Sequence, residues 1–244
     1  MNKKQINNEI NRWQMSESIM IGILLAFSGG YMDAYTYVFR GKVFANAQTG
    51  NIILLGINIS GLNYSEAVRY LIPVISFIAG VFTAQMLKLK FGNTRKIHWR
   101  QIGILVEIII MLVVSLMGTD LNLVANSMIS YACGIQVQSF RKIHDNSLAT
   151  TMCIGNLRTA TDLLCGSIIK KDTSLFHRSI FYYGVIFIFT IGAISGKNCI
   201  AILGQQAILV SVVILSIVFL FMFFEKEVEI DILRAGQKNK RKFK

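Results

Sequence analysis

Long apolar runs alternate with short polar or charged stretches along this chain, and the lengths of the runs predict helices that span a membrane. A run of about 17 to 25 apolar residues crosses a hydrocarbon layer roughly 30 Å thick. The runs with this character are residues 19–38, 70–87, 101–117, 123–140, 180–196 and 203–224. The pattern therefore predicts an all-α polytopic membrane protein with six transmembrane helices. Pro73 would lie in the first turn of the second helix, where its missing N–H costs least.

Polar segments flank the apolar region at both ends of the chain. Residues 1–18 resemble the flank of a signal peptide, but the apolar run that follows is longer than a signal and has no clear cleavage site. We therefore expect the run to remain as the first helix. This gives an N-terminal tail at 1–18, a transmembrane domain at 19–224 and a basic C-terminal tail at 225–244.

The distribution of Lys and Arg predicts the topology. With six spans and a cytoplasmic N-terminus, the basic loops 88–100 and 141–179 and the C-terminal tail fall inside, while 118–122 and 197–203 fall outside. This agrees with the positive-inside rule. Eight spans would place the loop 88–100 outside. Three cations fit poorly in the outer segment 39–69, namely Arg40, Lys42 and Arg69.

Composition supports a membrane protein and argues against other classes. The chain is 53% hydrophobic and 16% charged, with a net charge of +12 and a mean hydropathy of +0.53. Its basic residues gather in tails and loops, which favours anionic lipid head groups as partners over nucleic acid. The four cysteines lack metal-ligand spacing, and no pattern of a hydrolase, metalloprotease or P-loop occurs, so we expect no cofactor, no metal and no enzymatic activity.

The chain contains a weak internal repeat. Residues 29–51 align without gaps on residues 134–156, so that a helix end is followed in each case by a Gly-Asn step. The halves, 19–118 and 122–224, each hold three spans, and an odd number requires them to insert in opposite orientations. We therefore expect inverted repeats. The short segments 48–59 and 153–165 would then be re-entrant or broken helices near a midplane site.

Small residues recur at matching positions of the second and fifth predicted helices. Gly80 and Ala84 correspond to Gly192 and Gly196 at an offset of 112 residues. Such steps allow helices to approach closely at the interface between the repeats, although the pattern is also common in ordinary helix packing.

Asp33 is the first candidate for a functional residue because an ionisable group inside a membrane helix is costly. The alternative is a helix-end position from which the carboxylate reaches water. In the gapless alignment its counterpart is Gln138, and Gln136 points to another side of the same helix. A substrate would be held by Asp33, Gln48, Thr49, Asn51, Gln136, Gln138 and Asn156.

Other polar residues have two readings each. Glu107 is either a second proton-carrying group after Asp33 or a partner of Lys96 or Arg100. Asn51 and Asn156 either line a pathway or cap the short helices that follow them. The cations Arg141 and Arg158 fit topology determinants and phosphate contacts better than ligands.

Several motifs together resemble the YoaK family of bacterial membrane proteins. The first half carries Gly30-Tyr31-Met32-Asp33-Ala34, Gly41-Lys42-Val43-Phe44 and Thr49-Gly50-Asn51, and the second carries Gly134-Ile135-Gln136, Arg141, Ala149-Thr150-Thr151 and Gly155-Asn156-Leu157. Val137 and Ile154 depart from the family pattern. The resemblance implies six transmembrane helices and at most a transport role. We therefore expect a multi-pass protein of the bacterial cell membrane, whose termini are both cytoplasmic by the charge pattern above.

These observations favour a small-molecule permease or carrier with its site at the interface between the repeats. The alternative is a membrane accessory subunit that binds a protein partner and transports nothing. The sequence identifies neither the substrate nor the oligomeric state.

Overall fold

The computed structural model describes residues 19–91, 99–143, 146–147, 151 and 153–222. Both predicted tails, most of the basic loop 88–100, and the motif residues Ala149 and Thr150 lie outside these ranges. The elements in chain order are α2 (Ile19–Val38), α3 (Gln48–Ser60), α4 (Tyr64–Phe91), α5 (Trp99–Ser115), the 3-10 helix η2 (Thr119–Leu121), α6 (Asn122–Ser139), β1 (Lys142–Ile143), β2 (Asn146–Ser147), α7 (Cys153–Lys170), α8 (Thr173–Leu203) and η3 (Gly204–Ile208), followed by a helical segment at 209–222.

The fold is helical, as the sequence predicts, apart from the two-residue strands β1 and β2, which pair antiparallel. By length and composition, three described segments are apolar enough to cross a membrane: Ile19–Val38, Tyr64–Phe91 and Thr173–Met222. The last is a 50-residue run that contains the break at η3, where Gly204 has a φ of +52°. The chain therefore has the helices of a membrane protein.

The observed helices match the predicted ones best where apolar runs end sharply. The first helix has the predicted bounds, and α5 and α6 begin and end within two residues of them. The prediction for Pro73 is wrong, because α4 begins at Tyr64 and Pro73 lies well inside it, buried. Residues 64–69 are too polar to be recognised as part of a span, yet they are helical because α4 packs along α3 there.

The fifth predicted helix is also longer than its apolar run. Helix α8 begins at Thr173, because the Asp172 side chain caps it by accepting a 2.8 Å hydrogen bond from the Ser174 backbone N–H. The predicted outer loop at 197–203 is wrong, since α8 continues to Leu203 and the chain turns at 204–208. Lys197 therefore lies on a helix, where a long side chain can reach the membrane surface.

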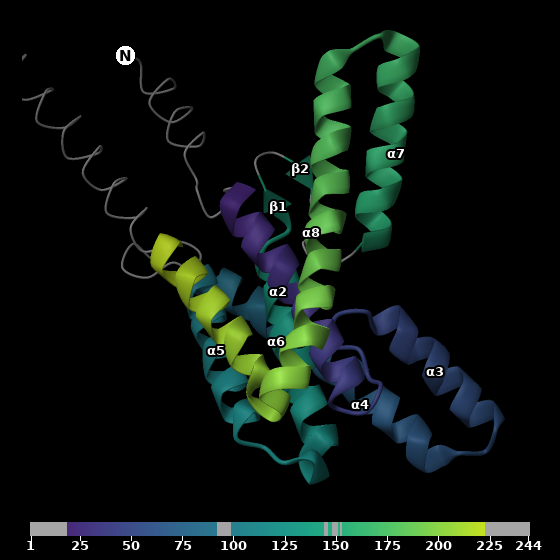
Figure 1. The fold of residues 1–244 in the computed structure, drawn as a ribbon, viewed down its shortest axis with the longest axis vertical. Helices are drawn as coiled ribbons and strands as arrows, with labels where there is room; N and C mark the ends of the chain where they lie inside the picture. Colours follow the sequence, from purple (N-terminus) through teal and green to yellow (C-terminus); the bar gives the residue numbers. More distant parts are fainter. Residues whose placement is uncertain (1–18, 92–98, 144–145, 148–150, 152, 223–244) are drawn as a thin grey trace, which may run out of the picture.

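Helices from different halves of the chain pack together. Helix α2 packs on α8, and α4 packs on α6. Helix α3 packs along α4, and α7 packs along α8. Figure 1 shows the result as a central body from which two helical hairpins extend in different directions. We call these the α3–α4 arm and the α7–α8 arm. Each arm turns at a non-glycine residue of positive φ, Leu62 at 57° and Lys171 at 53°.

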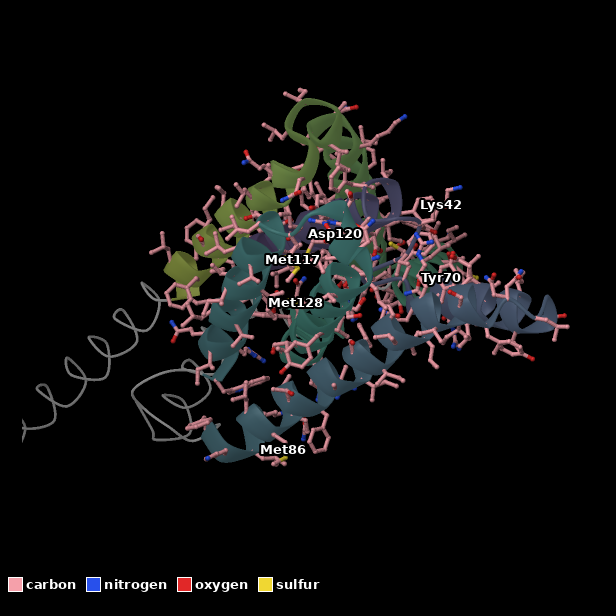
Figure 2. The ribbon with its side chains drawn as sticks, turned by 90° about the horizontal axis from the view of Figure 1, so that it is seen from below. Lys42, Tyr70, Met86, Met117, Asp120 and Met128 are labelled. Atoms are coloured by element: carbon pink, nitrogen blue, oxygen red, sulfur yellow. The ribbon has the colours of Figure 1, made fainter. Side chains whose placement is uncertain are left out.

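The arms differ from the segments that the sequence predicted. Helices α3 and α7 are continuous over 13 and 18 residues, so neither is a broken helix. Figure 2 shows α4 running from the tip of its arm past Tyr70 to Met86 at the opposite end. Ile52, Ile53 and Ile57 on α3 are exposed, as expected of side chains that face lipid rather than a protein core.

Glycines allow the helices of the two halves to touch through their backbones. A Cβ at Gly80 would collide with the Tyr131 carbonyl, and a Cβ at Gly134 with the Phe77 carbonyl. The α2–α8 pair has the same reciprocal contacts, between Gly30 and Phe189 and between Gly192 and Phe27. The predicted close approach at Gly80 and Gly192 is confirmed, and it lies between the halves.

These contacts also correct the alignment of the repeat. Matching the two helix pairs places Gly30, rather than Gly29, in the position of Gly134. The position of α6 that corresponds to Asp33 is then Val137 and not Gln138. The gapless alignment fails because the stretch from the glycine contact to the Gly-Asn step is one residue longer in the second half, Gly134 to Gly155, than in the first, Gly30 to Gly50.

Candidate functional site

Asp33 is buried in α2 and faces protein. Its side chain is 7% exposed, and its Oδ1 accepts a 2.7 Å hydrogen bond from the backbone N–H of Asn46. The backbone amides of Ala45 and Ala47 also interact with this carboxylate. The reading in which Asp33 reaches water from a helix end is therefore wrong. The carboxylate instead holds the chain just before the first turn of α3, where an acid also interacts favourably with the helix dipole.

The segment between α2 and α3 returns into the protein. After α2 ends at Val38, the chain comes back to the level of Asp33, where the Asn46 side chain donates a 3.2 Å hydrogen bond to the Gly29 carbonyl. Asn51 fixes this return by bonding both the N–H and the C=O of Phe44, at 2.9 and 2.7 Å. The loop 39–47 is thus re-entrant relative to the end of α2.

The second half contributes a residue to the same place. Thr151, just ahead of α7, packs on Gly29, since a Cβ at Gly29 would meet the Thr151 side chain. Thr151 stands five residues before Asn156, as Asn46 stands five residues before Asn51. The segments that precede the two short helices therefore meet at one glycine of α2. The Gly-Asn steps themselves come slightly later in the chain than Asn46 and Thr151, and Gly155 has open space around it.

Glu107 lies at the middle of α5 and is completely buried. Neither of its carboxylate oxygens has a hydrogen-bond partner among the described residues, so the reading in which it pairs with Arg100 is wrong, while Lys96 lies outside the described ranges. Cys133 of α6 is also completely buried, and both Glu107 and Asp33 act on it electrostatically, which indicates that the three groups share one region of the core.

Gln136 stands one turn after Cys133 on α6 and is also fully buried. Its Nε2 donates a 3.3 Å hydrogen bond to the Leu25 carbonyl of α2, and its Oε1 has no partner among the described residues. We define the central polar cluster by its five members, which come from α2, α5, α6 and the re-entrant loop: Asp33, Asn46, Glu107, Cys133 and Gln136.

The remaining predicted site residues do not join this cluster. Gln48 and Asn51 bond one another at 2.9 Å and stabilise the loop before α3. The capping reading of Asn51 is wrong, because Ala47 is the N-cap of α3 and no side chain caps that helix. Thr49 is exposed. Gln138 donates a 2.7 Å hydrogen bond to Gln85 of α4, at the contact between the halves. Asn156 is buried on α7, whereas Gly155 beside it faces open space.

Sequence reasoning missed Asn46 and Cys133. Cys133 could be recognised in the sequence only as one of four cysteines without metal-ligand spacing, because its complete burial and its nearness to the two carboxyl groups are tertiary properties. Asn46 belongs to a segment without periodicity. The signal that could have identified it is its place five residues before the first Gly-Asn step, matched by Thr151 before the second.

Arg40 explains part of the poor fit in the predicted outer segment. Its side chain is fully buried and donates to the Tyr35 hydroxyl at 3.1 Å, to the Val114 and Gly118 carbonyls at 3.0 and 2.9 Å, and to Asn122 at 3.3 Å. The Val114 carbonyl lies in the last turn of α5 and the Gly118 carbonyl in the turn that follows, next to the negative end of the helix dipole. Arg40 is therefore a structural cation rather than a loop charge.

A metal centre finds no support in the described residues, which contain no group of three or more potential His, Cys, Asp or Glu ligands. All four cysteines are free. Arg158 is strongly exposed on α7 and lies 3.9 Å from Asp162, which agrees with a surface role.

A bundle of long apolar helices with buried carboxyl groups and a re-entrant loop defines a helical integral membrane protein. Comparison with known families agrees: the family described as a protein of unknown function (DUF1275) matches residues 21–221, and the chain belongs to this family. The chain is also similar to the UPF0700 transmembrane protein YoaK of Bacillus subtilis (strain 168), with 27% identity over 177 residues, covering 70% of this chain and 79% of that protein. No solved structure matches the chain.

Proposed function

We propose that this protein is a small-molecule carrier of the cell membrane whose substrate site is the central polar cluster. The observation that carries the proposal is the meeting of Asn46 and Thr151, one from each half, at Gly29 beside the buried carboxyl group of Asp33. Carriers built from inverted repeats bind substrate near the membrane midplane, where interrupted segments of both halves converge.

Inverted repeats are part of this proposal. The exchange of helices supports them, because α2 packs on α8 through the same reciprocal glycine contacts by which α6 packs on α4. The offsets between the matched residues are 104 for the α2 and α6 pair and 112 for the α4 and α8 pair. The directions of the arms also support inverted repeats, since Figure 1 shows the two arms extending in different directions from the body.

Six spans with both termini inside the cell complete the architecture that we propose. They correspond to α2, α4, α5, α6, α8 and the helical segment 209–222, whereas α3 and α7 enter the membrane within the arms. The burial of Arg40 supports this count, because it removes one of the cations that fitted the outer segment poorly. Arg69 is held similarly, by Glu66 at 3.0 Å and by the Gly41 carbonyl.

The two carboxyl groups have different duties in this proposal. Asp33 is engaged by the loop before α3, so that a change at the carboxylate is transmitted to the α3–α4 arm. Glu107 has no hydrogen bond to any described residue that protonation would disturb, and a buried charge without a partner is costly. We therefore assign the proton-carrying role to Glu107 first and to Asp33 second, reversing the order that the sequence alone favoured.

The test begins by identifying solutes. Metabolites are compared, without preselection, between cells that express the wild-type protein and cells that express Glu107→Gln, and each solute that differs is offered to proteoliposomes that contain either protein. We expect uptake by the wild type and a loss of at least about tenfold in the variant. Glu66→Gln, an exposed change, is the matched control. Absence of any wild-type flux, together with capture of a stoichiometric protein partner, would replace the carrier with an accessory subunit.

A further inference from the structure

The central polar cluster has more free acceptors than donors. Both oxygens of Glu107, Oδ1 of Asn46 and Oε1 of Gln136 have no hydrogen-bond partner among the described residues. Each of these three residues is at least nine-tenths buried. Buried polar atoms are usually hydrogen-bonded, so a group of unpaired ones indicates a site for a ligand that supplies what is missing.

The orientation of the two amides is fixed by their other contacts. Asn46 Nδ2 donates to the Gly29 carbonyl at 3.2 Å, and Gln136 Nε2 donates to the Leu25 carbonyl at 3.3 Å. A backbone carbonyl only accepts, so the NH₂ end of each amide must face it. Rotating either amide to offer its NH₂ group to a ligand would break a bond to α2. The free end of both side chains is therefore an oxygen.

Charge points in the same direction. The cluster contains two carboxyl groups, and the fully buried cation among the described residues, Arg40, gives its hydrogen bonds to a hydroxyl, an amide oxygen and two backbone carbonyls rather than to Asp33 or Glu107. Among the described residues, no cation perturbs Asp33 or Glu107, and an acceptor-rich site with negative groups selects a positively charged ligand.

The acceptors come from separate elements. Glu107 lies on α5, Gln136 on α6 and Asn46 in the loop before α3, and the two amides bond the carbonyls of Leu25 and Gly29, which are one helical turn apart on α2. The described residues also contain no group of three or more His, Cys, Asp or Glu side chains that could hold a metal ion. Acceptors contributed by several elements suit a ligand that presents several N–H donors at once.

We propose that the central polar cluster binds a small organic cation with several N–H donors, of the primary amine or guanidinium class. This rests on the proposed carrier function and names the class of its substrate. Glu107 contributes the main charge contact, while Asn46 and Gln136 accept hydrogen bonds from the remaining N–H groups.

Three probes separate charge from hydrogen bonding in an equilibrium binding assay on the full-length protein in detergent. Guanidinium has both a permanent charge and N–H donors, tetramethylammonium has the charge alone, and urea has the donors alone. We expect saturable binding of labelled guanidinium, displaced by excess unlabelled guanidinium and not by equal concentrations of the other two. Displacement by tetramethylammonium or urea at the same concentration, or no saturable guanidinium binding, overturns the proposal.

Variants then locate the site. Glu107→Gln should weaken guanidinium binding by at least about tenfold, because a charged contact is replaced by a neutral one. Asp162→Asn, which removes an exposed carboxylate of α7, should change binding less than about twofold. Equal binding by the Glu107→Gln protein would refute the site. If that variant does not fold, Glu107→Asp takes its place, and the three-probe comparison on the wild type stands without either. Guanidinium binding without flux would remove the carrier proposal and retain the ligand class.

Discussion

Replacing Arg40 by alanine should destabilise the protein severely, although the residue is remote from the proposed substrate site. The guanidinium makes hydrogen bonds to four groups on α2, α5, the turn at Gly118 and the start of α6, and the Arg40 backbone carbonyl accepts a 2.9 Å bond from Asn126. It also lies over the rings of Tyr35 and Phe39, at 5.5 and 5.2 Å from their centroids. One side chain therefore joins the ends of three helices, α2, α5 and α6.

The magnitude follows from the hydrogen bonds that the guanidinium loses. A hydrogen bond to a charged group contributes about 1.5–3 kcal/mol, and the variant loses four of them, although the carbonyls of Val114 and Gly118 keep the backbone N–H groups of Met117 and Leu121 as partners. Burying the guanidinium itself has a cost that the variant no longer bears, and this offsets part of the loss. We expect a net loss of about 2–4 kcal/mol. For a domain of this size that corresponds to a fall of roughly 4–16 °C in Tm.

Thermal stability of the purified protein in detergent, followed by the loss of the monodisperse species on size-exclusion chromatography, measures this effect. Arg158→Ala is the matched control, because Arg158 is 85% exposed and its change should shift Tm by no more than about 2 °C. Arg40→Lys should lie between the two, since one ammonium cannot reach all four acceptors. A Tm of Arg40→Ala within the range of the control would refute the assignment of Arg40 as a structural cation.

Gly192→Leu should prevent α8 from packing on α2, because a Cβ at this position would meet the Phe27 carbonyl, and the yield of folded protein on size-exclusion chromatography should fall. Gly184→Leu, at a position of the same helix with open space around it, should leave the yield unchanged. Asn51→Ala removes three hydrogen bonds that fix the re-entrant loop and should cost about 1–3 kcal/mol, seen as a lower Tm; an unchanged Tm would show that the loop is held elsewhere. In a protein whose native cysteines are replaced by serine, an impermeant thiol reagent on intact cells should label Leu62→Cys and not Lys171→Cys; equal labelling would contradict opposite orientations of the two arms.

Local sequence signals predicted the fold where the physical cause is also local. The apolar run 19–38 became a helix with those bounds, because its length and burial depend on the run itself. The ends of α4 and α8 were missed, since polar residues such as Glu66 and Arg178 are helical only through the neighbouring helix of each arm. Propensity is a weak prior that such tertiary contacts override.

The candidate site was predicted in part. Asp33 and Glu107 could be singled out because carboxyl groups are rare inside apolar runs. Their relation to Asn46, Cys133 and Gln136 depends on how four separate segments fold together, which no spacing in the sequence encodes. Polar residues near the Gly-Asn steps were expected to face the site, but Asn51 satisfies its own loop instead.

The exchange of helices between the halves has a consequence for biosynthesis. Gly30 of α2 packs on α8, whose Gly192 follows it by 162 residues. At about 5–20 residues per second, the ribosome needs roughly 8–30 seconds to supply that partner. During this interval α2 has entered the bilayer with its glycine face uncovered, so the first half cannot mature before the second is made. Truncation at the boundary between the halves should therefore yield a fragment that membrane quality control degrades, whereas the two halves produced together as separate chains should rescue one another.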